Sequence, residues 1–152
     1  MVSLSVRLRR VVALEDPLLR AIADSSVDIS PRPGAWSKKQ ELGHLIDSAA
    51  NNRVRFIKAA LEGKYDGPSY DGCGWVDIGG YADMPWSDLV GLWKALNLAL
   101  AAVLERIPED RLQAECRIGD GPAVTLDFVI DDYIAHMQHH LDHILSPAEP
   151  RP

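Results

Sequence analysis

Four long segments of this chain carry apolar residues at helical spacing, and no segment carries a convincing strand pattern. They run from about residue 5 to 23, 37 to 61, 83 to 107 and 125 to 145. Apolar side chains three and four positions apart fall on one face of a helix, which must pack against another element. Pro17 predicts a break or kink in the first segment. The pattern therefore predicts an all-α fold.

The links between these segments decide how the helices can pack. Residues 30–34 form a short Pro-rich link, which makes the first two helices antiparallel neighbours. Residues 63–84 form a long irregular link rich in Gly, Tyr and Asp, and such a length is typical of a functional loop or a crossover. A crossover lets the second and third helices run parallel, and a short return then sets the fourth antiparallel to the second. We therefore expect residues 1–152 to form one four-helix-bundle domain.

Charge and composition argue against several classes of partner. The 152-residue chain has a formal net charge of −6, whereas a nucleic-acid surface needs clustered Lys and Arg. Its basic cluster at residues 7–10 is short and isolated, so we expect no nucleic-acid binding. We see no signal peptide and no apolar stretch that approaches the roughly 20 residues of a membrane span, so we expect no membrane. We expect Cys73 and Cys116 to be reduced loop residues and the chain to be cytoplasmic.

All five histidines lie in two of the predicted helices. His44 lies in the second helix, and the other four crowd into residues 136–143 of the fourth. His136 and His140 are four residues apart, so a helix places both imidazoles on one face, one turn apart. Histidine is the commonest metal ligand near neutral pH. Two histidines on one helix and a third from elsewhere form a metal site with open coordination positions.

The two histidine segments fall at the same level of the predicted bundle. His44 follows the predicted helix cap Ser37 by seven residues, which places it about 10 Å into its helix. His140 precedes Leu145 by five residues, which places it about 8 Å from the end of its helix. In antiparallel helices these two levels coincide. His44, His136 and His140 are therefore able to converge at one end of the bundle.

A helical wheel separates the four histidines of the last helix. His136 and His140 lie along one flank of the apolar stripe, and Tyr133 lies along the same flank, where we expect it to contact the substrate. His139 points nearly opposite the core, so we interpret it as solvent-facing. The wheel leaves His143 undecided.

A line of polar residues follows His44 along the second helix: Asp47, Ser48, Asn51 and Arg55. One interpretation is an ordinary solvated helix surface. Because His44 forms one end of the line, the other interpretation is a polar cavity that leads to the metal. In that case Asp47 has two possible roles, to orient His44 or to accept a proton, and Asn51 or Arg55 would hold a substrate carboxylate.

Residues of the long link allow two interpretations. Tyr70, Asp71 and Trp75 either shape the mouth of the pocket and contact the substrate, or pack the crossover against the bundle. Cys73 lies among them as a conceivable ligand or nucleophile, but we favour a plain reduced loop cysteine. For the histidines the alternative is a set of core and surface side chains that bind no metal.

Several blocks of the sequence together form a recognisable pattern. They are Gly-Ala-Trp-Ser at 34–37, Glu-Leu-Gly-His-Leu-Ile-Asp-Ser-Ala at 41–49, Asn-Asn-Arg at 51–53, the region 70–76, Trp86 with Trp93, and residues 132–141 with their His-x-x-x-His. With these blocks the chain resembles the DinB-like (DinB/YfiT) superfamily of metal-binding helical bundles. The resemblance covers residues 36–144, and the combination of the first histidine block with the distal His-x-x-x-His is fairly specific.

The resemblance implies a four-helix bundle with up-down-down-up topology, often dimeric. It also implies a divalent metal held by three histidines, which map here onto His44, His136 and His140. Its characterised members are thiol-dependent transferases and a related isomerase, and others are described only as candidate metal-dependent hydrolases. The implied partners are a small-molecule thiol, an electrophilic substrate and a second copy of the chain. Three imidazoles suit Zn, Ni or Fe, so the metal's identity stays open.

The chemistry of such a site leads to one expected function and two alternatives. A bound metal lowers the pKa of a coordinated water toward ~7 and ionises a coordinated thiol outright, and either species is a nucleophile. We expect a metal-dependent S-transferase that activates a low-molecular-weight thiol. The alternatives are a hydrolase that uses metal-bound water and a non-catalytic metal- or ligand-binding bundle.

Overall fold

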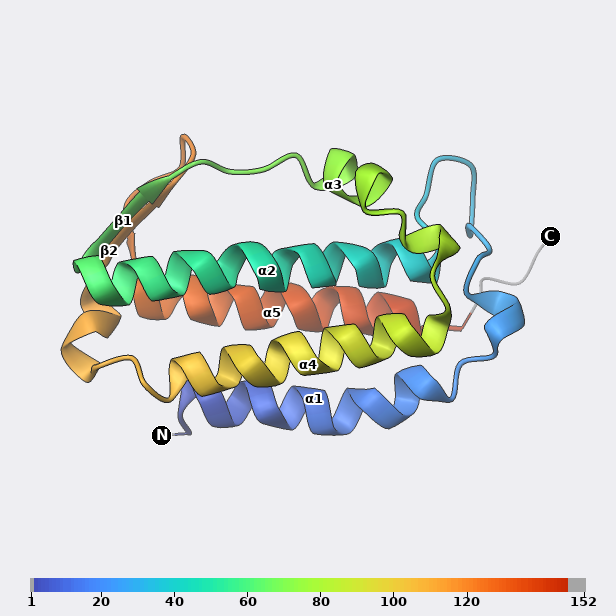
Figure 1. Cartoon of the computed structure of the whole chain (residues 1–152), viewed down its shortest axis with the longest axis horizontal. Helices are drawn as coiled ribbons and strands as arrows, with labels where there is room; N and C mark the ends of the chain where they lie inside the picture. Colours follow the sequence, from blue (N-terminus) through green and yellow to red (C-terminus); the bar gives the residue numbers. More distant parts are fainter. Residues whose placement is uncertain (1, 148–152) are drawn as a thin grey trace.

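The computed structural model describes residues 2–147, and four long helices packed side by side make up most of it (Figure 1). These helices are α1 (Leu4–Arg20), α2 (Lys38–Glu62), α4 (Trp86–Leu104) and α5 (Leu126–Leu145). Following the colours of Figure 1, α1 and α5 run in one direction along the bundle, and α2 and α4 run in the other. The neighbours α2 and α5 are therefore antiparallel.

The ends of α2 follow local sequence signals. The Ser37 side chain accepts a hydrogen bond from the Gln40 backbone, and the Gln40 side chain accepts one from the Ser37 backbone, which completes a capping box. Gly63 ends the helix in the left-handed conformation, at φ 77°. In α1, by contrast, the helix passes through Pro17 and ends at Arg20, so the break predicted there is absent.

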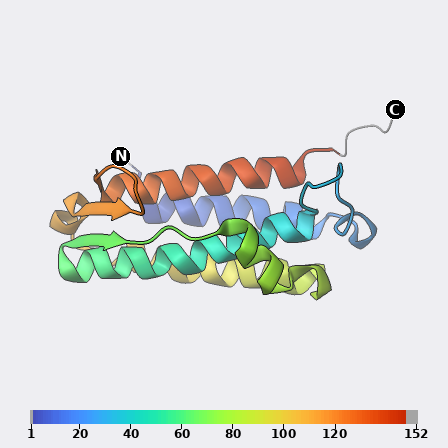
Figure 2. The same ribbon diagram turned by 90° about the horizontal axis from the view of Figure 1, so that it is seen from above.

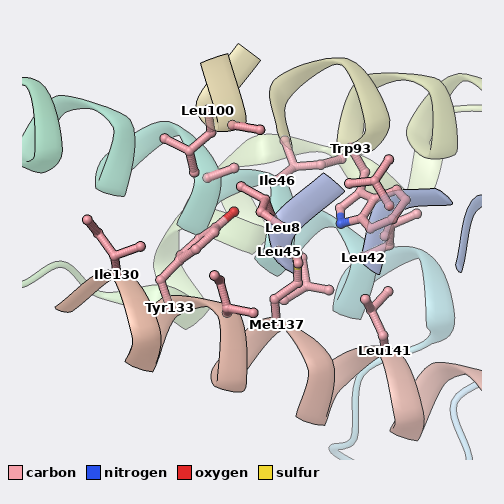
Figure 3. Close-up of a cluster of buried hydrophobic side chains, with 14 of the residues drawn as sticks. Leu8, Leu42, Leu45, Ile46, Trp93, Leu100, Ile130, Tyr133, Met137 and Leu141 are labelled. Atoms are coloured by element: carbon pink, nitrogen blue, oxygen red, sulfur yellow. The ribbon is translucent and has the colours of Figure 1, made fainter. Parts of the chain in front are cut away.

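The core is a continuous apolar cluster to which all four long helices contribute. Its largest side chains are fully buried, and each contributes about 1.5–3 kcal/mol through the burial of apolar surface. Figure 3 shows this cluster with Leu8 from α1, Leu42, Leu45 and Ile46 from α2, Trp93 and Leu100 from α4, and Ile130, Met137 and Leu141 from α5.

A small three-stranded sheet is present beside the helices, so the predicted all-α class is incomplete. The sheet has the strand order β1-β2-β3, with β1 parallel and β3 antiparallel to β2. Its strands are four, four and two residues long, too short to show a strand pattern in the sequence. The elements outside the four long helices are β1 (Lys64–Gly67), α3 (Gly72–Gly79), β2 (Glu115–Ile118), β3 (Val124–Thr125) and three 3₁₀ helices at Asp24–Ser26, Tyr81–Asp83 and Glu109–Gln113.

The link between α2 and α4, residues 63–85, runs back along α2 as a crossover (Figures 1 and 2). It is not the irregular segment that the sequence suggests, because it contains β1, α3 and a 3₁₀ turn. The Tyr81 ring anchors it against α2 at Gly43, where an added Cβ would lie 2.1 Å from Tyr81 Cδ2. A glycine at position 43 therefore lets the crossover approach the helix.

Helix α4 corrects another expectation from the sequence. By length and composition it is long and apolar enough to cross a membrane, although the sequence seemed to contain no such stretch. In the bundle α4 packs against α1 and α2, and the Trp86 indole N–H donates a hydrogen bond to the Leu19 carbonyl of α1. This packing buries 39% of the most apolar part of the helix.

The two cysteines occupy regular elements rather than the loops that we expected. Cys73 is exposed in α3, and Cys116 is buried in β2. Both thiols are free, and burial raises the pKa of the Cys116 thiol.

Candidate metal centre

Three histidines from the two antiparallel helices α2 and α5 converge on one point. One ring nitrogen each of His44, His136 and His140 lies within 4.8 Å of the other two. The Nε2 atoms of His44 and His136 are 3.3 Å apart, and the ring centroids of the three are 4.6 to 5.2 Å apart. The structure thus brings together the three histidines singled out in the sequence.

The spacing of the rings fits a transition-metal ion. Bonds from such an ion to histidine nitrogen are about 2.0–2.1 Å long, so two histidine nitrogens on a tetrahedral ion lie about 3.3 Å apart. The two Nε2 atoms of His44 and His136 have this separation. A donor set of three imidazoles suits Zn, Ni or Fe, whereas Mg and Ca prefer oxygen ligands.

The electrostatics of the group keep two of the rings neutral at pH 7. Burial lowers the pKa of His44 to about 4, with further lowering by His140 and His136. Burial and the neighbouring His140 also lower the pKa of His136, against a smaller opposing effect of Asp132. Because the neutral imidazole is the form that binds a metal, these rings are already in the ligand state.

The histidine group has a carboxylate partner that the sequence reasoning missed. Glu41 is buried, and its Oε1 lies 3.0 Å from His140 Nδ1 and 2.6 Å from His143 Nδ1, while its Oε2 lies 2.9 Å from His143 Nδ1. Burial alone raises the pKa of Glu41, but its hydrogen bonds with both imidazoles outweigh this and lower it. Glu41 precedes His44 by three residues, one helical turn, and that spacing was the available signal.

The other two histidines of α5, His139 and His143, lie outside the convergent group. His143, undecided from the sequence, contacts Glu41 through Nδ1 and keeps 54% of its side chain exposed. His139 is exposed, as the helical wheel predicts, and its ring is nearly perpendicular to that of His140, with 5.5 Å between the centroids.

The predicted catalytic residue Asp47 faces the crossover. Asp47 is buried, and its Oδ1 accepts a hydrogen bond of 2.5 Å from the Tyr81 hydroxyl. Burial raises the pKa of Asp47, and the bond from Tyr81 partly opposes this. Within residues 2–147 neither Asp47 Oδ2 nor His44 Nδ1 has a hydrogen-bond partner. The bond by which Asp47 was to orient His44 is therefore not formed.

Asn51 and Arg55, predicted to bind substrate, are engaged by the helix and the crossover. The Asn51 side chain donates to the Asp47 backbone carbonyl at 2.9 Å. Arg55 donates to the Pro68 carbonyl at 3.2 Å, and its guanidinium lies 5.6 Å from the centre of the Tyr70 ring. The polar line is thus neither a plain solvated surface nor the lining of the cavities described below, because the crossover lies on it.

The two aromatic residues predicted to bind substrate have different environments. Tyr133, labelled in the core of Figure 3, is only 4% exposed. Its hydroxyl donates to Asn97 Oδ1 at 2.5 Å, and its ring packs edge-on to Phe56. A substrate-binding role for Tyr133 is therefore wrong, because the core uses both its ring and its hydroxyl. Trp75 is 44% exposed on α3 and packs on Tyr70, with 5.5 Å between ring centroids.

Among residues 2–147, neither of two prominent cavities is lined by the three histidines. A cavity of about 210 Å³ is lined by Trp36, Glu41 and His143 among others, so it adjoins the outer side of the histidine group. A second, of about 940 Å³, lies at the other end of the bundle between the start of α1 and the start of α5.

A four-helix bundle with three convergent histidines between α2 and α5 defines a class of helical proteins with an imidazole-rich site. Within this class the family is clear: a sequence profile of the DinB superfamily matches residues 7–144, and the chain belongs to that superfamily.

Similar proteins are named as candidate metal-dependent hydrolases. YfiT of Bacillus subtilis, by name a candidate metal-dependent hydrolase, is 25% identical over 138 residues, which are 90% of this chain and 78% of YfiT. A candidate metal-dependent hydrolase of Oceanobacillus iheyensis is 26% identical over 81% of this chain and 71% of its own length. The solved YfiT structure, described as having an unusual four-helix bundle topology, superposes with a TM-score of 0.82 over 93% of this chain and 81% of that chain.

A more distant structural neighbour shows the fold alone. It is a mycothiol-dependent maleylpyruvate isomerase, 14% identical, with a TM-score of 0.73 over 93% of this chain and 62% of that chain. The family, its relatives named as candidate metal-dependent hydrolases and the three-histidine group together support the binding of a divalent metal.

Proposed function

We propose that this protein is a metal-dependent enzyme whose divalent transition metal, Zn, Ni or Fe, is held by His44, His136 and His140. The observation that carries the proposal is the convergence of three imidazole nitrogens within 4.8 Å, at a spacing that suits one ion. The proposal includes an up-down-down-up order of the four helices. In that order α2 and α5 are antiparallel, so the two histidine segments lie at one level of the bundle.

The reaction that we propose is the transfer of a low-molecular-weight thiol to an electrophilic substrate. A bound divalent ion supplies Lewis acidity that ionises a thiol in an open position. This chain's histidines would orient that position. Among residues 2–147, no carboxylate joins the group of ligand atoms formed by the three histidines. Because the ion itself would ionise the thiol, the proposed transfer requires no carboxylate base beside the three histidines.

Hydrolysis is the second candidate, and the names of the relatives that match most of the chain favour it. In a metal-dependent hydrolase, a side chain that accepts the proton of the attacking water would assist the metal. Asp47 remains the residue proposed for that step, since its buried Oδ2 has no hydrogen-bond partner within the described residues and its pKa is raised. Asn51, Arg55 and Trp75 remain proposed substrate contacts beside the crossover.

One assay separates the two reactions. Protein loaded with Zn, Ni or Fe is incubated with a panel of small thiols and a halogenated aromatic acceptor, and in parallel with ester and amide substrates. Halide release that requires both the thiol and the metal supports the transferase. Hydrolysis without any thiol, lost in Asp47→Asn, would instead establish the hydrolase.

We also propose that the protein acts as a homodimer. Light scattering coupled to size-exclusion chromatography is expected to give twice the mass of one chain, and a monomeric mass at micromolar concentration would reject this proposal.

A further inference from the structure

Four side chains form a contact layer, here called the rung, across the interface of α2 and α5: Glu41, His44, His140 and His143. On α2, Glu41 and His44 are three residues apart, and on α5, His140 and His143 are three residues apart. Each pair shares a helix face, and the contacts of Glu41 with His140 and His143 join the two pairs across the helix interface. The rung therefore links the inner histidines to a buried carboxylate and to a half-exposed imidazole.

The protonation state of this rung follows from its donors and acceptors. A carboxylate has oxygens that accept hydrogen bonds, and those of Glu41 lie against ring nitrogens of both His140 and His143. The Nδ1 atoms of His140 and His143 must then carry the protons that point at its oxygens, 3.0 and 2.6 Å away. In the neutral form of His140 the lone pair is left on Nε2.

That tautomer is the one that a metal bound between the three rings requires. His44 and His136 face each other through Nε2, at 3.3 Å, so an ion between them is reached from His140 by the nitrogen that does not face Glu41. His44 has no equivalent support, because its buried Nδ1 is unpartnered within residues 2–147. Within the described residues, the hydrogen bond that orients a ring of the ligand set from outside comes from Glu41 to His140.

We propose that Glu41 is a positioning residue that fixes the tautomer and direction of His140, and that His143 in turn holds the Glu41 carboxylate. This rests on the proposed function, since it presupposes a metal at the three histidines. A carboxylate behind a ligating imidazole also raises the basicity of the ligand, and its loss typically weakens metal binding about 10–100-fold. His143 adjoins the cavity of about 210 Å³, so the outer end of the rung is open to small molecules.

The first test measures metal affinity with a competing chromogenic chelator and Zn²⁺. Glu41→Gln keeps the size of the side chain but removes the negative charge behind His140, so we expect an affinity loss of about 10–100-fold. His143→Ala leaves the bond between Glu41 and His140 in place, so a smaller loss, below about 10-fold, is expected. The matched control is His139→Ala, one residue from His140 and exposed, which should bind as the wild type does.

The second test needs no metal. Long-range ¹H–¹⁵N NMR spectra of the metal-free protein report which nitrogen of each imidazole is protonated. We expect the Nδ1–H tautomer at His140 in the wild type and its loss in Glu41→Ala, with circular dichroism confirming that the variant is folded. An Nε2–H tautomer in the wild type, or equal Zn²⁺ affinities in wild type and Glu41→Gln, would overturn the positioning role. A wild type that binds no Zn²⁺, Ni²⁺ or Fe²⁺ would reject the proposed function itself.

Discussion

The beginning and the middle of α2 carry polar residues that look alike in the sequence but behave differently in the structure. At the beginning, Glu41 and His44 face the histidines of α5. In the middle, Asp47, Asn51 and Arg55 bind the crossover or their own helix. At the beginning of α2, the His44 ring nitrogen Nε2 faces that of His136. In the middle of α2, the polar side chains form most of their hydrogen bonds with the crossover or with their own helix.

This difference separates a binding site from a structural clamp. Buried polar atoms are nearly always hydrogen-bonded, so a group of buried acceptors without partners needs an explanation. The middle of α2 meets this requirement largely by holding the crossover, for example through Tyr81. Of the three convergent imidazoles, His44 and His136 pair with each other through Nε2, and a cation between the rings would bind a nitrogen lone pair of all three. Metal affinity should therefore depend on the beginning of α2, and stability on its middle.

The largest effect expected concerns the ligands. His140→Ala removes one of three imidazoles and should lower metal affinity by more than about 100-fold, beyond the effect of losing an outer partner. His139→Ala, its neighbour on the exposed face of α5, should bind one metal ion per chain with unchanged affinity. Isothermal titration calorimetry checks both. Loss of metal by the His139 variant alone would reverse our assignment of the two faces.

A change in the middle of α2, at the contact of Asp47 with Tyr81, should lower stability rather than metal affinity. Tyr81→Phe leaves the buried Asp47 carboxyl without its hydrogen bond, which should lower the free energy of unfolding by about 1–3 kcal/mol. Metal affinity should change by less than twofold, because neither residue belongs to the histidine group. Urea denaturation and metal titration of the same variant give both numbers. A variant that keeps its stability and loses its metal would break the distinction between the two parts of α2.

The metal-free protein should become less stable in acid through His44. Its pKa is about 4 in the folded chain and about 6.5 in an unfolded one, so between these values the unfolded state takes up the extra proton. Stability from this group is complete above about pH 6.5 and decreases as the pH falls toward 4. Urea midpoints at pH 7 and pH 5 measure the decrease, which should be smaller in His44→Gln. An equal decrease in both proteins would show that other groups cause it.

The smallest effect is expected at Arg55. Its hydrogen bond to Pro68 and its contact with the Tyr70 ring are partly exposed, so Arg55→Ala should cost less than about 1 kcal/mol of stability. If Arg55 holds a substrate carboxylate, as proposed, the variant should raise KM with little change in metal affinity. An unchanged KM would leave Arg55 as a contact of the crossover only.

Sequence reasoning located the histidine group because that result depends on two regular quantities, the helical repeat and the antiparallel course of α2 and α5. It missed Glu41 because an acidic residue in the first turn of a helix is common for electrostatic reasons alone. It placed Tyr133 in the site because a helical wheel shows the direction of a side chain but not how closely the next helix packs on it. The hydrogen bond to Asn97 exists only in the assembled core.

The sheet was missed for a different reason. The parallel pairing of β1 with β2 joins Lys64 to Glu115, residues far apart in the sequence, and each strand is only four residues long. Such a pairing depends on the bundle that brings the strands together, and no local pattern predicts it. The same holds for Tyr81, whose contact with Gly43 and Asp47 requires the crossover to fold back on α2.

The central claim is that His44, His136 and His140 hold one metal ion. Anomalous diffraction from crystals of the Zn²⁺-loaded protein, recorded on both sides of the zinc edge, tests it most directly. We predict one peak per chain, about 2.0–2.1 Å from a nitrogen of each of the three imidazoles, with Glu41 on the far side of His140. A peak elsewhere, or three imidazoles around a site with no anomalous signal, would contradict the claim.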